Sequence, residues 1–156
     1  MCRSFGYKEE VVRRSPSNSG PKPKNLAELY RNQGKYGAAE PLYVEALAMR
    51  KQFLGEVHPD VAINTNNLAL LYSNQGKYEA AEQLYVEALA MDKQLLGKAH
   101  PFVATSQWSL GVLYQKKGAY QQAEALYEEA LAISKSALGT EHLTTQGIQS
   151  SLDSLP

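Results

Sequence analysis

Apolar residues recur at three- and four-residue steps through most of the chain, a pattern that predicts amphipathic helices. In the middle of the chain, Pro59 suits the first turn of a helix and Gly76 suits its end, so one helix is predicted from Pro59 to about Gln75. Its apolar side carries Thr65, Leu68, Leu71 and Tyr72. A second helix is predicted from about Tyr78 to a stop at Gly97, with a stripe of Tyr78, Ala81, Tyr85, Ala88, Leu89, Leu95 and Leu96. The turn at 74–77 is too short for anything but antiparallel neighbours, so the pair is a predicted helical hairpin.

The same hairpin recurs with a period of 42 residues. The three histidines, His58, His100 and His142, are each 42 residues apart, and 27 of the 35 residues of segment 25–59 are identical in segment 67–101. Nine of the ten tyrosines follow the same period, as Tyr30/Tyr72/Tyr114, Tyr36/Tyr78/Tyr120 and Tyr43/Tyr85/Tyr127. The predicted organisation is three repeats, at about 25–57, 58–99 and 100–141, followed by a partial fourth repeat helix or frayed C-terminus at 143–156.

Small residues explain how such hairpins stack. Alanines recur one turn from the tyrosines of the second helix and would let helix backbones approach: Ala39, Ala81, Ala123, Ala46, Ala88 and Ala130. Because one hairpin alone leaves an apolar face open to water, successive copies must bury it against each other. The predicted fold class is therefore all-α, an α-solenoid of stacked antiparallel helical hairpins.

These positions resemble the tetratricopeptide repeat family, whose pattern is W-x2-L-G-x2-Y followed by A-x3-F. The third copy has Leu110-Gly111-x2-Tyr114 and Ala123-x3-Tyr127, and the first two copies have Leu-Ala-x2-Tyr and Ala-x3-Tyr. The family's Trp position holds Pro23, Thr65 and Gln107, and its closing Pro is missing. The period exceeds the usual 34 residues and each unit closes in Lys-Gln-x-Leu-Gly-x-x-His-Pro or its like, which is similar to the 42-residue subclass of the kinesin light chain. The resemblance implies a superhelix that binds protein partners.

The ends differ from the repeats. Residues 1–24 carry six basic and two acidic side chains and contain 15–24, a run rich in Pro, Ser and Lys, so we expect a basic, disordered tail. The remaining residues carry a net charge of −4. We expect the chain to be a fragment, or a shortened product, of a longer array, and to be marginally stable or to self-associate through its open C-terminal end.

Composition disfavours several classes of function. Sixteen basic and sixteen acidic side chains give no net charge to attract nucleic acid, and no run of about 18 apolar residues could span a membrane. A single cysteine, Cys2, permits a cytoplasmic location. The histidines would lie side by side along the stack, so we expect them to begin helices and not to bind metal. Glu40, Glu82 and Glu124 recur likewise and suit surface or local pairing. We expect no cofactor, no metal site and no enzymatic activity, because the chain also has no phosphate-binding glycine loop.

The favoured function is a binding groove lined by the first helix of each repeat, which the resemblance implies. The candidate groove residues lie opposite the buried Leu and Tyr: Lys24, Glu28, Arg31 and Asn32 in the first copy, Ile63, Asn66, Leu70, Ser73 and Asn74 in the second, and Thr105, Trp108, Val112, Gln115 and Lys116 in the third. Their amides and hydroxyls suit an extended peptide backbone, and Arg31 and Lys116 would favour an acidic residue in it. Trp108 is either a peptide-binding aromatic or a cap on the partial fourth helix. The alternative function is a structural spacer or oligomerisation element of a larger signalling protein.

Overall fold

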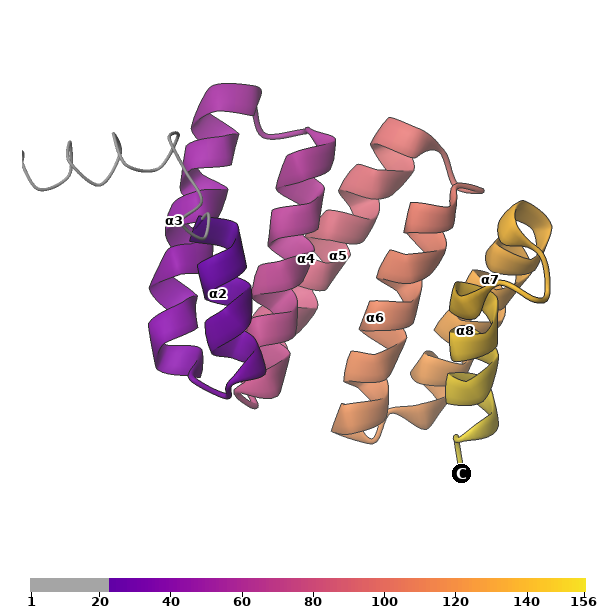
Figure 1. The fold of residues 1–156 in the computed structure, drawn as a ribbon. Coiled ribbons are helices and arrows are strands. Elements are labelled where there is room, and N and C mark those ends of the chain that lie inside the picture. The colour runs from indigo at the N-terminus through magenta and orange to yellow at the C-terminus, as the bar shows by residue number, and fades with distance from the viewer. Residues whose placement is uncertain (1–22) are drawn as a thin grey trace, which may run out of the picture.

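The computed structural model describes residues 23–156, which form seven helices and no strand (Figure 1). The helices are α2 (Pro23–Asn32), α3 (Tyr36–Leu54), α4 (Pro59–Asn74), α5 (Tyr78–Leu96), α6 (Pro101–Lys117), α7 (Tyr120–Leu138) and α8 (Leu143–Asp153). The predicted bounds of the central hairpin are confirmed within one residue. Most of the predicted disordered tail lies outside the described residues, but its last two residues belong to α2, which begins at Pro23.

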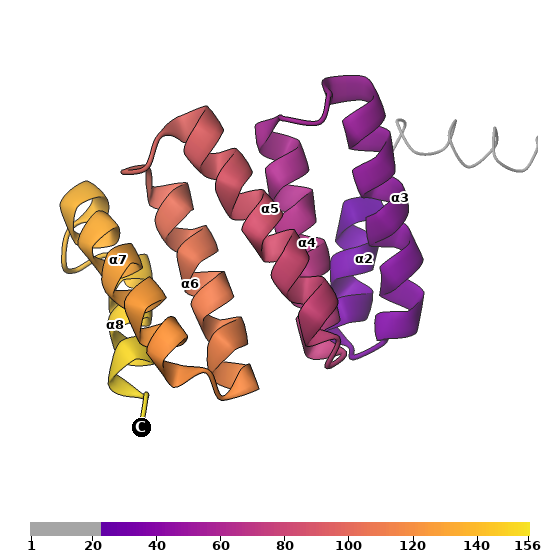
Figure 2. The ribbon, with the colours of Figure 1, turned by 180° about the vertical axis from the view of Figure 1, so that it is seen from behind.

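The helices form an α-solenoid of antiparallel hairpins, α2–α3, α4–α5 and α6–α7, with α8 packed against α7. The first helices of the hairpins, together with α8, make one layer, which faces the viewer in Figure 1. The second helices, α3, α5 and α7, make the other layer, which faces the viewer in Figure 2, where the molecule is turned by 180°. Consecutive hairpins contact one another through α3 with α4 and α5 with α6. The all-α solenoid predicted from the repeat is confirmed.

Glycine makes the turn within each hairpin possible. Gly34, Gly76 and Gly118 have φ angles of 73°, 78° and 80°, a left-handed conformation that other residues adopt only with strain. After Gly76, the amide of Lys77 donates back to the carbonyl of Tyr72 at 2.9 Å, which closes the end of α4. The helix end predicted at Gly76 is therefore confirmed, and Gly34 and Gly118 occupy the same position in the other hairpins.

The core follows the repeating tyrosines and alanines. Tyr43, Tyr85 and Tyr127 are all buried, and Ala39, Ala81 and Ala123 are completely covered. The packing is tight at Gly111, where a methyl group would lie 2.6 Å from the Tyr127 ring. Leu95 departs from the predicted apolar stripe of α5, since it lies near the end of the helix and is exposed.

The three histidines begin the first helices, as the sequence predicted. The Nδ1 atoms of His58, His100 and His142 accept hydrogen bonds from the amides two residues further on, at 3.1, 3.1 and 3.2 Å. These amides would otherwise have no partner in the first turn of a helix. The histidines therefore act as N-caps.

Glutamates of the second helices link one hairpin to the next. Glu82 accepts hydrogen bonds from Tyr114 at 2.9 Å and from Lys117, and this lysine also lies over the Tyr114 ring. The hydrogen bond from Lys117 is the main cause that holds the pKa of the Glu82 carboxyl below its usual value. Glu40 makes the same contact one repeat earlier, with Tyr72, Gln75 and Lys77. These two glutamates therefore pair with side chains of the next hairpin and not locally, whereas Glu124 is exposed on the surface.

Candidate functional site

A hollow of about 240 Å³ lies between the first helices of the second and third hairpins. We call it the α4–α6 hollow. Its lining comes from α4, α6 and the last turns of α5: Ala62, Ile63, Asn66, Asn67, Asp92, Phe102, Thr105 and Ser106. It arises because α4 and α6 both pack on α5 and make little contact with each other. The hollow thus opens on the layer of first helices, where the sequence predicted a groove.

An acidic side chain, Asp92, lies in this hollow. Asp92 is only 7% exposed, and one of its carboxylate oxygens accepts a hydrogen bond of 2.5 Å from the Ser106 hydroxyl. Burial raises the pKa of the Asp92 carboxyl, while the Ser106 hydrogen bond and the charge of His100 act to lower it. None of the ion pairs formed within residues 26–156 involves Asp92. The hollow therefore holds a buried acid that forms no ion pair with these residues, although the charge of His100 acts on it from a greater distance.

Three of the predicted groove residues line the α4–α6 hollow. Ile63 is 40% exposed, Asn66 is half-buried and Thr105 is exposed at the mouth. The Thr105 hydroxyl donates to the carbonyl of Pro101 at 3.3 Å, which leaves its lone pairs available. The side-chain oxygen of Asn66 is buried and accepts no hydrogen bond from the residues that the structure describes. Ile63 therefore offers an apolar surface, and the side-chain oxygens of Asn66 and Thr105 can accept further hydrogen bonds.

Other predicted groove residues are held within the fold. Ser73 is buried and accepts a hydrogen bond of 3.2 Å from Lys116. Gln115 accepts from the Tyr127 hydroxyl at 2.8 Å and donates to Ser154 at 3.3 Å. Each of these side chains thus has a partner on another helix or at the chain's end.

The remaining predicted residues fall into two groups. Leu70 and Val112 are half-buried and pack against the core, and Arg31 pairs with Glu28 at 3.5 Å with its side chain 14% exposed. Asn32 and Asn74 are exposed, and neither lines the hollow. The side chain of Lys24 lies outside those described.

Trp108 contacts α8. Its indole N–H donates to the Ser151 hydroxyl at 2.8 Å, and its ring covers Gly147 so closely that a methyl group there would lie 2.5 Å from a ring carbon. Trp108 also packs against the third core cluster and does not line the α4–α6 hollow. These contacts agree with the second role considered for Trp108, a cap on the helix of the partial fourth repeat, and not with a peptide-binding aromatic.

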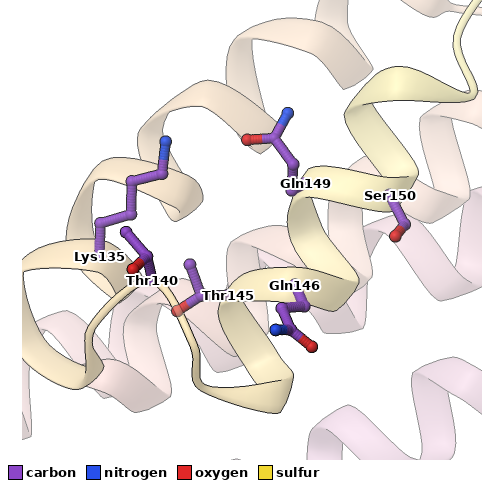
Figure 3. Close-up of a pocket in the computed structure, with 6 residues that line it drawn as sticks. All are labelled: Lys135, Thr140, Thr145, Gln146, Gln149 and Ser150. Atoms are coloured by element: carbon purple, nitrogen blue, oxygen red, sulfur yellow. The ribbon is translucent and has the colours of Figure 1, made fainter.

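A second hollow, of about 520 Å³, lies between α7 and α8 (Figure 3). Its lining residues are polar: Lys135, Thr140, Thr145, Gln146, Gln149 and Ser150. Figure 3 shows the Lys135 amine and the Gln149 amide reaching to the same side of it. In the two preceding repeats the residues equivalent to Gln146 are Ala62 and Ala104, which are buried in the core. This hollow is therefore the face of α8 on which the second helix of a hairpin would pack.

Two further kinds of site were sought in the described part of the chain. No three His, Cys, Asp or Glu side chains in it come together in a way that could hold a metal ion. None of its helices has the length and apolar character needed to cross a membrane.

Five residues of the α4–α6 hollow had not been singled out from the sequence: Ala62, Asn67, Asp92, Phe102 and Ser106. A signal was present at two of them, because the repeat changes chemistry there. The position of Asp92 holds Arg50 and Ser134 in the other copies, and that of Phe102 holds an acidic residue or a threonine. A position whose residue type changes between otherwise nearly identical repeats is one where the stacking of the hairpins does not require a particular side chain.

Comparison with known proteins agrees with this architecture. A sequence profile described as tetratricopeptide repeat matches residues 22–94 and residues 66–136. The crystal structure of BtubC (BKLC) from P. vanneervenii is similar, with a TM-score of 0.72 and 28% identity over 83% of this chain and 51% of that one. The nearly identical TPR-like repeats of a Podosopora anserina kinesin light chain have a TM-score of 0.76 and 28% identity, over 83% of this chain and 62% of theirs. The chain thus spans about half to three-fifths of these structures. Comparison with curated proteins gave no match.

Proposed function

The chain belongs to the tetratricopeptide repeat family, and we propose that it is a non-catalytic peptide-binding module. It resembles the kinesin-light-chain-like members of the family, whose repeats mediate protein–protein interaction. The bound segment of the partner protein would lie across α4 and α6 on the layer of first helices. Proteins of this family are typically scaffolds, which supports a role without catalysis. A cytoplasmic location is part of the proposal and rests on the single cysteine of the chain.

The observation that carries this proposal is the α4–α6 hollow. It combines an exposed apolar side chain, Ile63, with polar groups from Asn66 and Thr105 that can bond to a peptide backbone. Further along the same two helices, Lys116 donates a hydrogen bond of 3.2 Å to the Ser73 hydroxyl, which joins α6 to α4. A preformed surface of this kind lowers the entropic cost of binding.

Selection of peptides against the full chain tests the proposal. Peptides from a random display library are selected on the wild-type chain, and their affinities are then measured by fluorescence anisotropy. Ile63→Glu places a charge at the mouth of the hollow, and we expect it to weaken binding at least about tenfold. Val86→Glu is the matched control, because Val86 is 49% exposed on α5 in the other layer. Equal losses in both variants, or none in Ile63→Glu, would remove the assignment to this surface.

The alternative function, a spacer or oligomerisation element, makes a different prediction. Self-association through the C-terminal end would use exposed side chains of α7 and α8, which include Lys135, Gln146 and Ser150 and the apolar Leu143, 82% exposed. Most of these side chains are polar, so they offer little apolar area to drive association. Light scattering over a range of concentrations separates the two functions: a constant mass supports the binding module, and a rising mass supports the spacer.

A further inference from the structure

The buried carboxylate of Asp92 accepts a hydrogen bond from Ser106 on the next hairpin but forms no ion pair with the residues that the structure describes from 26 to 156. We propose that the α4–α6 hollow is a subsite for an arginine side chain of the bound peptide, in which Asp92 receives the guanidinium group. This inference rests on the proposed function and specifies the chemistry of the partner.

The charge balance around Asp92 supports a cationic ligand. At the equivalent position of the preceding repeat, Arg50 pairs with Asp60 at 3.1 Å, and in the following repeat Ser134 shares a hydrogen bond of 2.6 Å with Thr145. Within the described part of the chain, Asp92 accepts a hydrogen bond only from the neutral hydroxyl of Ser106, and the charge of His100 acts on it without forming an ion pair. Buried carboxylates are costly unless they are paired with a cation, so a cation that enters the hollow supplies what the fold does not.

The lining of the hollow suits the rest of an arginine side chain. Ile63 and Phe102 are 40% and 53% exposed, and both line the hollow, so they can cover the methylene groups of the arginine. The Phe102 ring can also attract the guanidinium through its face. Asp92 and the unpartnered oxygen of Asn66 are acceptors, whereas guanidinium carries five donors and no acceptor. A planar, donor-rich cation matches this wall better than the compact ammonium of lysine.

The arginine subsite also revises the preference expected from the sequence. Arg31 and Lys116 were expected to favour an acidic residue in the peptide. Arg31 pairs with Glu28, so its positive charge is already balanced by a neighbour, and Lys116 donates a hydrogen bond to Ser73. The α4–α6 hollow itself presents a negative group, and an acidic peptide side chain would meet a like charge there.

The test uses the peptides that were selected from the random display library on the wild-type chain. Each is synthesised with its arginine unchanged, replaced by citrulline, which keeps the shape and removes the charge, or replaced by lysine. Binding is measured to the wild-type chain, to Asp92→Asn and to Glu128→Gln. Asp92→Asn keeps the size of the side chain and its acceptor for Ser106, and Glu128→Gln removes an exposed acid on α7. Thermal melting of each variant confirms that it is folded.

We expect the selected peptides to be enriched in arginine. We also expect Asp92→Asn and citrulline each to weaken binding roughly tenfold to a hundredfold. The two losses should not add, because both remove the same ion pair, and Glu128→Gln should bind as the wild type does. Peptides that lose affinity in Ile63→Glu but contain no required arginine would overturn this inference and leave the binding surface standing. Full binding by the lysine peptides would overturn the assignment to guanidinium. Failure to obtain any peptide sensitive to Ile63→Glu would overturn both proposals.

Discussion

Replacement of Gly147 by alanine should destabilise the chain, although alanine is the better helix former. Gly147 lies in the middle of α8, where an added methyl carbon would sit 2.5 Å from one ring carbon of Trp108 and 2.9 Å from another. Neither distance is compatible with carbon–carbon contact, so the indole must move. Any such movement also stretches its hydrogen bond to Ser151, which measures 2.8 Å.

The magnitude follows from three opposing contributions to the free energy of unfolding. Alanine gains about 1 kcal/mol over glycine in a helix interior. Overpacking against the ring costs about 1–3 kcal/mol, and loss of the indole hydrogen bond costs about 1 kcal/mol. The expected net loss for Gly147→Ala is therefore about 1–3 kcal/mol. In a chain that also carries Trp108→Ala the overlap is absent, and the same substitution should stabilise by up to about 1 kcal/mol.

Urea unfolding of the wild type, the two single variants and the double variant measures this change of sign. Gly37→Ala is the matched control, since Gly37 is a helical glycine of α3 with no other group within 4 Å of an added methyl carbon. It should be neutral or stabilise by up to about 1 kcal/mol. A Gly147→Ala variant as stable as the wild type, or equally destabilising with and without the indole, would refute the packing of Trp108 on α8.

Three further predictions concern contacts between and within the repeats. Tyr127→Phe removes the hydrogen bond to Gln115 and should cost about 1 kcal/mol in chemical unfolding, because a buried acceptor loses its partner. His142→Ala removes the N-cap of α8 and should cost about 0.5–2 kcal/mol, seen as faster amide exchange in that helix. Since Lys117 lowers the pKa of Glu82, that carboxylate stabilises the fold above its ordinary pKa of 4.5, and the contribution is lost as pH falls through the lowered value. In Glu82→Gln, stability measured by melting should therefore fall less steeply on acidification.

The fold could be predicted from the sequence because each of its elements is specified locally and repeated. Gly76 ends one helix, Pro59 begins another, and the 42-residue period brings the same alanine and tyrosine contacts back in each hairpin. Helical spacing also identified the buried side of α4 correctly, with Thr65 and Leu71 fully covered. These features depend on neighbours in sequence or on a repeat of them.

The candidate site was harder to predict because it depends on which side chains find partners on another helix. Helical spacing placed Trp108 on a free face of α6, but it could not show that Ser151 and Gly147 would lie opposite the indole. Asp92 belongs to the second helix of its hairpin, α5. Its side chain lines the hollow only because α4 and α6 both pack against this helix. Such contacts arise from tertiary packing and do not appear as a periodic pattern in the sequence.

The central claim is that a partner peptide binds across α4 and α6. It is tested most directly by nuclear magnetic resonance, in which a selected peptide is titrated into the isotopically labelled full chain and the backbone amide shifts are mapped. The account predicts that the largest changes fall at residues 62–67 and 102–106, around the α4–α6 hollow, with α3, α5 before its last turns, and α7 little affected. Changes centred on the outer layer of second helices, or on the face of α8, would contradict it.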